Sequence, residues 1–157
     1  MKTLISLSLL LPLASACASG SSKAELDAEV KRLCAIDGGV KVYETVTLPP
    51  DKFNQWGQPN FYRPDQGENA LGSEYVFNRE TVYYKQGNPE MWRTHYKLVR
   101  RKDKKLLGES VSYSRRGGDA PGPWHESSFG CPDNRGDIPF LMKIFVQENW
   151  QKGMHHD

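Results

Sequence analysis

The sequence predicts an α+β domain with a four-stranded antiparallel sheet, an N-terminal and a C-terminal helix, two long loops and one disulfide. Three observations predict this fold class. A segment with helical periodicity precedes a series of β-prone segments, the connections between the later β-prone segments are short, and two cysteines are available for pairing. Short connections favour antiparallel strands, and we expect the helices to cover one face of the sheet, which completes an α+β domain.

Residues 1–16 have the features of a secretory signal peptide. Lys2 supplies a positive charge, residues 4–13 form a mostly apolar run, and small residues at 14–16 precede a cleavage point. The apolar run is shorter than the ~20 residues that span a bilayer. We therefore expect the chain to be exported without a permanent transmembrane helix.

Cys17 is the expected site of a lipid anchor. Residues 13–17 resemble a bacterial lipobox, although Ala14 stands where leucine is common. Lipidation of Cys17 leaves Cys34 and Cys131 as a pair, whereas an unmodified Cys17 leaves an odd thiol, which is uncommon in exported proteins. Attachment of more than one acyl chain anchors a protein stably.

Residues 17–22 are small and polar after the cysteine, which predicts a flexible tether between the anchor and a single domain at residues 23–157. Ala18, rather than an aspartate, follows the cysteine. By bacterial sorting rules this residue predicts an outer-membrane lipoprotein that faces the periplasm. The alternative is cleavage after Ala16 by ordinary signal peptidase, which gives a soluble periplasmic or secreted protein.

The domain begins with a predicted helix at residues 23–35, whose apolar side chains recur on one face. The glycines that follow it readily adopt the left-handed conformation that closes a helix. Residues 40–48 then alternate between apolar and polar, which predicts one strand, with Glu44 as the misfit on its apolar face. Two prolines end this strand because they cannot donate to a ladder.

Three more strands are predicted at residues 75–84, 92–101 and 106–114, and the first of them is interrupted by polar residues at 78–80. Residues 102–105 have the charge expected of a hairpin tip. The domain closes at residues 138–150 with a predicted helix. A buried strand is the alternative there because short apolar runs are ambiguous.

The first long loop, residues 51–73, carries four aromatic side chains, which are Phe53, Trp56, Phe61 and Tyr62. Loops of this length in a compact domain are often functional or disordered. We expect the rings to pin the loop to the body of the domain, because buried aromatic side chains pack in this way. The alternative is a partner-binding surface.

Cys34 and Cys131 are predicted to form a disulfide. Two thiols that remain in an oxidising compartment pair readily. Because they are far apart in the sequence, their closure restricts most of the unfolded domain. The competing interpretation is a catalytic cysteine that acts with His95 or His125.

The second long loop, residues 115–137, is the predicted binding site. It combines flexible glycines and rigid prolines with side chains that are common at binding hot spots. The candidate binding residues are Arg115, Arg116, Asp119, Trp124 and His125. The alternative is a structural loop in which Trp124 joins the core and the arginines are solvated.

Composition and motifs argue against several function classes. The formal net charge of +2 does not indicate a nucleic-acid partner. His125 and Glu126 begin a zinc-protease helix motif, but Phe129 stands where the second histidine is required. We found no complete catalytic motif and expect no metal or other cofactor.

Three segments carry a resemblance to a known group. They are CAIDGGVKVYET at 34–45, SYSRRGGD at 112–119 and SSFGCP at 127–132. In these segments the chain resembles small uncharacterised exported proteins of Gram-negative bacteria. The resemblance implies a bacterial envelope location and supplies no activity or catalytic residue.

The combined expectation is an exported, lipid-anchored envelope protein that binds a partner, such as an envelope protein or a cell-wall component, and is not an enzyme. Two alternatives remain. The first is an immunity or inhibitor protein that blocks a cell-wall-directed toxin or hydrolase. The second is a small envelope hydrolase that uses the Asp119–Glu126 loop.

Overall fold

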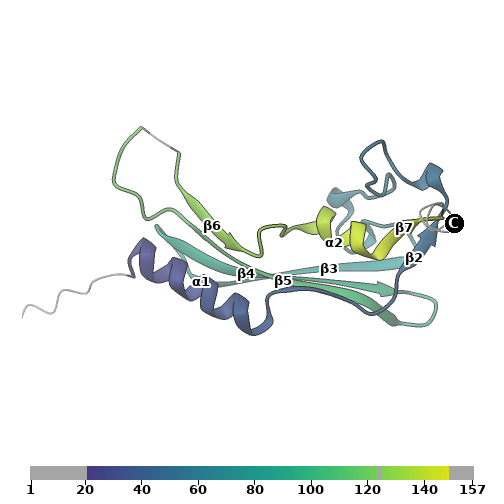
Figure 1. Cartoon of the computed structure of the whole chain (residues 1–157), viewed down its shortest axis with the longest axis horizontal. Helices are drawn as coiled ribbons and strands as arrows, with labels where there is room; N and C mark the ends of the chain where they lie inside the picture. Colours follow the sequence, from purple (N-terminus) through teal and green to yellow (C-terminus); the bar gives the residue numbers. More distant parts are fainter. Residues whose placement is uncertain (1–20, 124, 149–157) are drawn as a thin grey trace, which may run out of the picture.

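A long, twisted antiparallel sheet forms the frame of the computed structural model, which describes residues 21–123 and 125–148 (Figure 1). The chain is an α+β protein, as predicted. The sheet has five strands, which are β1 (Gly39–Val42), β3 (Tyr75–Lys85), β4 (Glu90–Arg100), β5 (Lys105–Arg116) and β6 (Ser128–Cys131). Their order is β1–β5–β4–β3, and β6 also pairs with β5.

The fifth strand, β6, was missed by the sequence analysis, which assigned its residues to the second long loop. β1 pairs with β5 only at residues 108–111, and β6 pairs with residues 113–116 of the same strand. β5 is longer than β1, so β1 leaves part of that edge of β5 unpaired. The second short strand, β6, pairs with this remaining part. The sheet therefore has one strand more than the four predicted.

Helix α1 (Lys23–Asp37) forms as the sequence predicts. Ser22 and Glu25 form a reciprocal capping box that satisfies two backbone N–H groups at its start. The buried face consists of Leu26, Val30 and Cys34, and it packs on side chains of β4 and β5.

The two glycines after α1 have different roles. Gly38 has φ −67° and ψ 146°, so it is extended and not left-handed. A Cβ on Gly38 would lie 2.5 Å from the Sγ of Cys34, so glycine is required there for space. Gly39 has φ +122°, a conformation that favours glycine, and it begins β1.

The predicted strand 40–48 is divided at residues 43–45, which corrects the sequence expectation. Its first part is β1, and its second part is β2 (Val46–Leu48), which leaves the main sheet. At the division, Glu44 forms ion pairs with Lys105 and with Arg100, the latter at 2.5 Å. A carboxylate cannot lie on the apolar face of a strand, so the chain turns where Glu44 meets these two cations.

The C-terminal prediction is correct in part. Helix α2 (Asp137–Ile144) is shorter than the predicted helix, and β7 (Phe145–Gln147) continues from it and pairs in parallel with β2. The apolar run thus contains both the predicted helix and the alternative strand. Residues 149 and 150 of the predicted helix lie outside the described residues.

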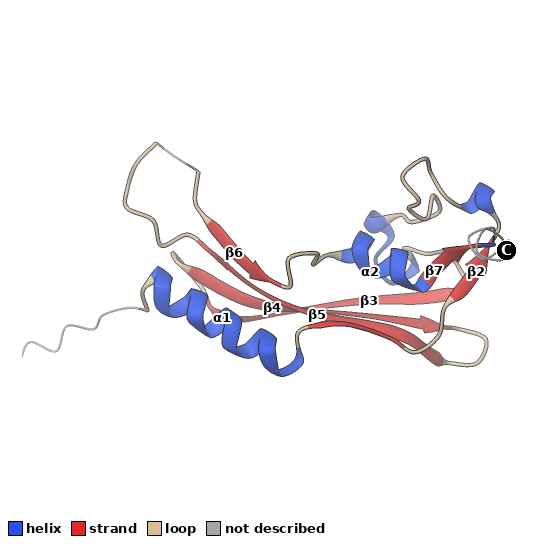
Figure 2. Ribbon diagram, in the orientation of Figure 1, coloured by secondary structure: helices blue, strands red, loops and turns tan. Residues whose placement is uncertain are grey.

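The two helices lie on opposite faces of the sheet, and not on one face as the sequence suggested (Figure 2). Val111, under α1, and Ser110 are neighbours on β5, so their side chains point to opposite faces. Ser110 pairs with Tyr96, which belongs to the core under α2. The strands therefore contribute apolar side chains alternately to two separate cores.

The first long loop covers the same face as α2. It contains two short 3-10 helices, η1 (Pro50–Lys52) and η2 (Pro64–Asn69). Phe53 is buried, and Phe61 and Tyr62 pack against the core. Trp56 is 68% exposed and does not share this role. Three of the four rings therefore pin the loop, as the sequence analysis expected.

The predicted disulfide is present. Cys34 of α1 is bonded to Cys131 of β6, and their Cα atoms are 6.0 Å apart. The bond closes a loop of 97 residues, which contains β1 to β5 and the first long loop. It therefore fastens α1 to the last strand of the sheet.

The Cys34→Ser, Cys131→Ser double variant is expected to lower the free energy of unfolding by about 2–5 kcal/mol, because its unfolded chain is no longer closed into a loop. Urea denaturation measures this loss. Reduction of the parent protein should give the same loss, and Cys17→Ser should retain the parent stability. An unchanged midpoint in the double variant would contradict the role of the bond.

Candidate functional site

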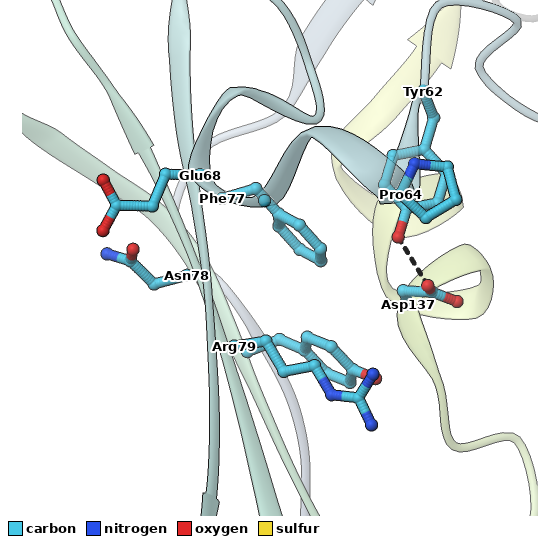
Figure 3. A pocket seen from close by; sticks show the side chains of 9 residues that line it. Tyr62, Pro64, Glu68, Phe77, Asn78, Arg79 and Asp137 are labelled. Atoms are coloured by element: carbon cyan, nitrogen blue, oxygen red, sulfur yellow. Dashed lines mark hydrogen bonds between the residues drawn. The ribbon is translucent and has the colours of Figure 1, made fainter.

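A pocket of about 280 Å³ lies between η2, β3, β4 and the start of α2 (Figure 3). This volume is close to the lower end of the range of small-molecule sites. Its lining is both aromatic and charged, and the side chains discussed below are Tyr62, Glu68, Phe77, Arg79, Tyr96 and Asp137.

Stacked rings form one wall of the pocket. Phe77 of β3 and Tyr96 of β4 lie with ring centroids 5.5 Å apart and planes 7° apart. Phe140 of α2 stacks on both rings from the core side. Because Phe77 and Tyr96 are each only 6% exposed, their positions are determined by packing. The wall is therefore rigid.

Arg79 is the cation of the pocket. It lies directly opposite Tyr96 in the pairing of β3 with β4, and its guanidinium is 5.9 Å from the centre of the Tyr96 ring. This distance allows a cation–π contact. Within the described residues Arg79 has no carboxylate partner and no hydrogen bond. The Tyr96 hydroxyl likewise has no hydrogen-bond partner among the described residues.

The opposite side of the pocket has a satisfied acid. The Tyr62 hydroxyl donates to Asp137 at 2.5 Å, and the backbone N–H of Ile138 donates to the other carboxylate oxygen at 2.8 Å. Burial and this hydrogen bond raise the pKa of Tyr62 well above its usual range. Tyr62 therefore remains a protonated donor at neutral pH.

The predicted binding loop lies at the other end of the sheet, and Arg115 is buried there. Its side chain is 2% exposed, and two of its nitrogens donate to the carboxylate of Asp27 on α1, at 2.7 and 3.0 Å. Its third nitrogen donates to the carbonyls of Gly117 and Ser127. The guanidinium therefore holds the loop to α1.

Asp119 is also engaged inside this loop. It accepts from Lys23 of α1 at 2.7 Å and from the backbone N–H and hydroxyl of Ser127 at 2.6 and 2.9 Å. These hydrogen bonds, chiefly the one from Lys23, lower the pKa of Asp119 to about 2. Asp119 therefore stays ionised and fixes the loop against the start of the helix.

The remaining candidates have other placements. Arg116 is 58% exposed and pairs with Glu90 at 2.9 Å and with Glu126 at 3.5 Å. His125 is exposed. Trp124 lies outside the described residues. The loop as a binding surface therefore stays a prediction that now depends on Arg116, His125 and Trp124.

His95 makes its described side-chain contact away from the second long loop. Its Nε2 lies 3.0 Å from Glu109, which also accepts from the Tyr43 hydroxyl at 2.7 Å. The hydrogen bond from Tyr43, and then that of His95, lower the pKa of Glu109. Asp119, in contrast, pairs with Lys23 and Ser127. Asp119 and Glu126 line one pocket in the second long loop, whereas the described contacts of His95 are with Glu109, so the hydrolase alternative stays untested.

The pocket was not predicted from the sequence. Arg79 appeared only as part of a polar interruption in a predicted strand, whereas β3 continues through it. The available signal was its spacing, since Phe77 and Arg79 lie on one strand face. Recognising Tyr96 as its partner required the register between β3 and β4.

Comparisons with protein-family models, curated proteins and solved structures find no match for this chain. Among the described residues, no helix is long and apolar enough to span a membrane.

Replacement of Asp27 by asparagine is expected to destabilise the protein by about 3 kcal/mol, because it leaves the buried Arg115 without its charge partner. Urea denaturation measures the effect. Glu29→Gln is the matched control on the same helix, because it breaks an exposed pair with Arg32 and should change stability little. Equal effects of the two variants would refute the role of Arg115.

Asp119 should stabilise the fold mainly above acidic pH. Its pKa is lower when folded than when unfolded, so its contribution is present above about pH 4 and is lost as the pH falls towards its folded pKa of about 2. We expect Asp119→Asn to have a lower Tm than the parent at neutral pH. The difference in Tm between the two proteins should become smaller as the pH falls through this interval.

Thermal unfolding followed at a series of pH values checks this expectation. Asp133→Asn is the control, because Asp133 is exposed and has no hydrogen bond or ion pair among the described residues. A Tm gap for Asp119→Asn that stays constant on acidification would contradict the assignment.

Proposed function

We propose that this chain is an exported, lipid-anchored protein of the bacterial cell envelope that acts by binding. The proposal is supported first by the cysteines. The disulfide uses Cys34 and Cys131 and leaves Cys17 as the remaining cysteine, directly after the signal-peptide features. A stable disulfide is compatible with an oxidising compartment outside the cytoplasm. Ala18 after Cys17 favours the outer membrane.

An anchor at Cys17 would set the orientation of the domain. Six residues, 17–22, precede α1, and an extended chain of that length reaches about 20 Å. The Lys23–Asp119 ion pair holds the second long loop beside the start of α1. That loop would therefore lie near the membrane. Helix α2, whose first residue lines the pocket, lies toward the opposite end of the sheet (Figure 1), so the pocket would face the periplasm.

The pocket is the observation that carries the binding role. It combines an aromatic wall with a guanidinium and a hydroxyl that have no hydrogen-bond partner among the described residues. Small-molecule sites typically have this combination of apolar walls and a few convergent polar groups. The carboxylate in the same wall, Asp137, is engaged by Tyr62 and by its own helix. The arrangement therefore favours recognition over proton transfer.

A second candidate is an immunity or inhibitor protein directed at a toxin or hydrolase of the cell wall. The second long loop favours it, because Arg115 and Asp119 hold the loop in place while Arg116 and His125 remain exposed. A loop that is ordered before binding loses less entropy when a partner docks. A tight complex with one partner, weakened by Arg116→Ala, would support this candidate.

Fractionation of Gram-negative cells that express the full chain tests the anchored location. The parent protein should be in the outer-membrane fraction, and mass spectrometry should show an acylated Cys17. The Cys17→Ser variant should carry no lipid, because a serine at this position cannot be lipidated. The Cys34→Ser, Cys131→Ser variant is the control and should retain the lipid.

Two results would overturn the proposal. An unmodified mature chain that begins at Cys17 or later in the soluble fraction would reject the anchor. A cytoplasmic chain that retains residues 1–16 would reject export altogether.

A further inference from the structure

We propose that the pocket between η2, β3 and α2 binds a small organic carboxylate with an apolar body, and that Arg79 and Tyr96 hold the carboxylate. This inference rests on the proposal that the domain acts by binding. It identifies the ligand class of that site.

Two neighbouring donors in the pocket, the Arg79 guanidinium and the Tyr96 hydroxyl, have no hydrogen-bond acceptor among the described residues. The guanidinium of Arg79 lies over the Tyr96 ring, and neither Arg79 nor the Tyr96 hydroxyl makes a hydrogen bond within the described part of the chain. Tyr96 is 6% exposed, so its hydroxyl belongs to a side chain that is more than nine-tenths buried and lines the cavity. No fully buried side-chain nitrogen or oxygen of the described residues lacks a hydrogen-bond partner, so this hydroxyl reaches the open space of the cavity. A ligand acceptor that enters the cavity can therefore bind it.

The state of Tyr96 agrees with a donor role. Burial raises the pKa of its phenol, and Arg79 opposes this effect only in part. The hydroxyl is therefore protonated at neutral pH. A guanidinium fork and an O–H in one place can donate together to a planar carboxylate, in the charge-assisted geometry that arginine favours.

The surrounding charges limit the ligand to a single negative charge. Asp137 already accepts from Tyr62 and Ile138, which reduces its repulsion of an anion. Glu68 extends away from the Arg79 guanidinium (Figure 3). One cation near two acids suits a monovalent carboxylate better than a phosphate, because a second negative charge would have no partner.

The rest of the pocket favours an apolar body. Pro64 and the rings of Tyr62 and Phe77 line the space beside the donors. Tyr62 and Phe77 meet edge to face, with centroids 5.8 Å apart, so their positions do not depend on a ligand. A cavity of about 280 Å³ holds a ring or short chain attached to the carboxylate.

Titration of the purified full chain with 3-phenylpropionate tests the inference. Calorimetry gives the affinity, and amide chemical shifts locate the ligand. The uncharged amide, 3-phenylpropanamide, should bind at least about tenfold more weakly, because a hydrogen bond to a charged group is the stronger kind. Inorganic phosphate should also bind more weakly than 3-phenylpropionate, because it has no apolar body to pack against the aromatic wall.

Variants of the two donors should act on the carboxylate specifically. Arg79→Gln should weaken 3-phenylpropionate binding about tenfold and leave binding of the amide unchanged. Arg79→Lys should bind 3-phenylpropionate with an affinity between those of the parent and Arg79→Gln, because lysine keeps the charge and loses the planar fork. Tyr96→Phe should weaken binding several-fold while it preserves the stacked ring. Lys97→Gln, an exposed charge on the opposite face of β4, is the control and should change nothing.

Three outcomes would overturn the inference. They are the absence of 3-phenylpropionate binding at millimolar concentration, equal binding of the carboxylate and its amide, and phosphate binding as tight as that of the carboxylate. These titrations are made in solution and do not depend on anchoring. Failure of the ligand class is therefore distinguishable from failure of export or lipidation, which fractionation reports.

Discussion

The pairing of β5 on both edges is the constraint on which the rest of the molecule depends. β4 pairs with one edge along the whole strand, from Lys105 to Arg116. β1 and β6 share the other edge, one after the other. An interior strand in this position fixes the register of its neighbours, because a slip of one residue would move every side chain to the wrong face. The two cores therefore both depend on β5.

The two ends of the sheet are held by different forces. At one end, α1 is attached to β6 by the Cys34–Cys131 bond and to the second long loop by the buried Arg115–Asp27 pair. At the other end, α2 and the first long loop are held by apolar and aromatic packing around Phe140. Covalent and ionic links hold the first end together. The second end contains the aromatic-walled pocket beside its core, where a ligand can enter.

The charged side chains divide into two groups by what they contact. Arg115, Asp119 and Glu44 are all paired with groups of the fold, and each determines the path of a loop or a strand break. Arg79 differs, because within the described residues it has no carboxylate partner and no hydrogen bond, and its guanidinium lies over the Tyr96 ring. A charge that the fold does not use is available for a ligand. This difference distinguishes Arg79 from the arginines that the sequence singled out.

Local sequence was sufficient for the features that depend on neighbours along the chain. The helical face of α1, the hairpin after β4 and the Cys34–Cys131 pairing were all predicted, because periodicity, turn residues and cysteine number are local or compositional. The role of Arg115, the break at Glu44 and the partnership of Arg79 with Tyr96 were not predictable in this way. Each depends on a contact between segments distant in the chain, and only strand register and packing bring those segments together.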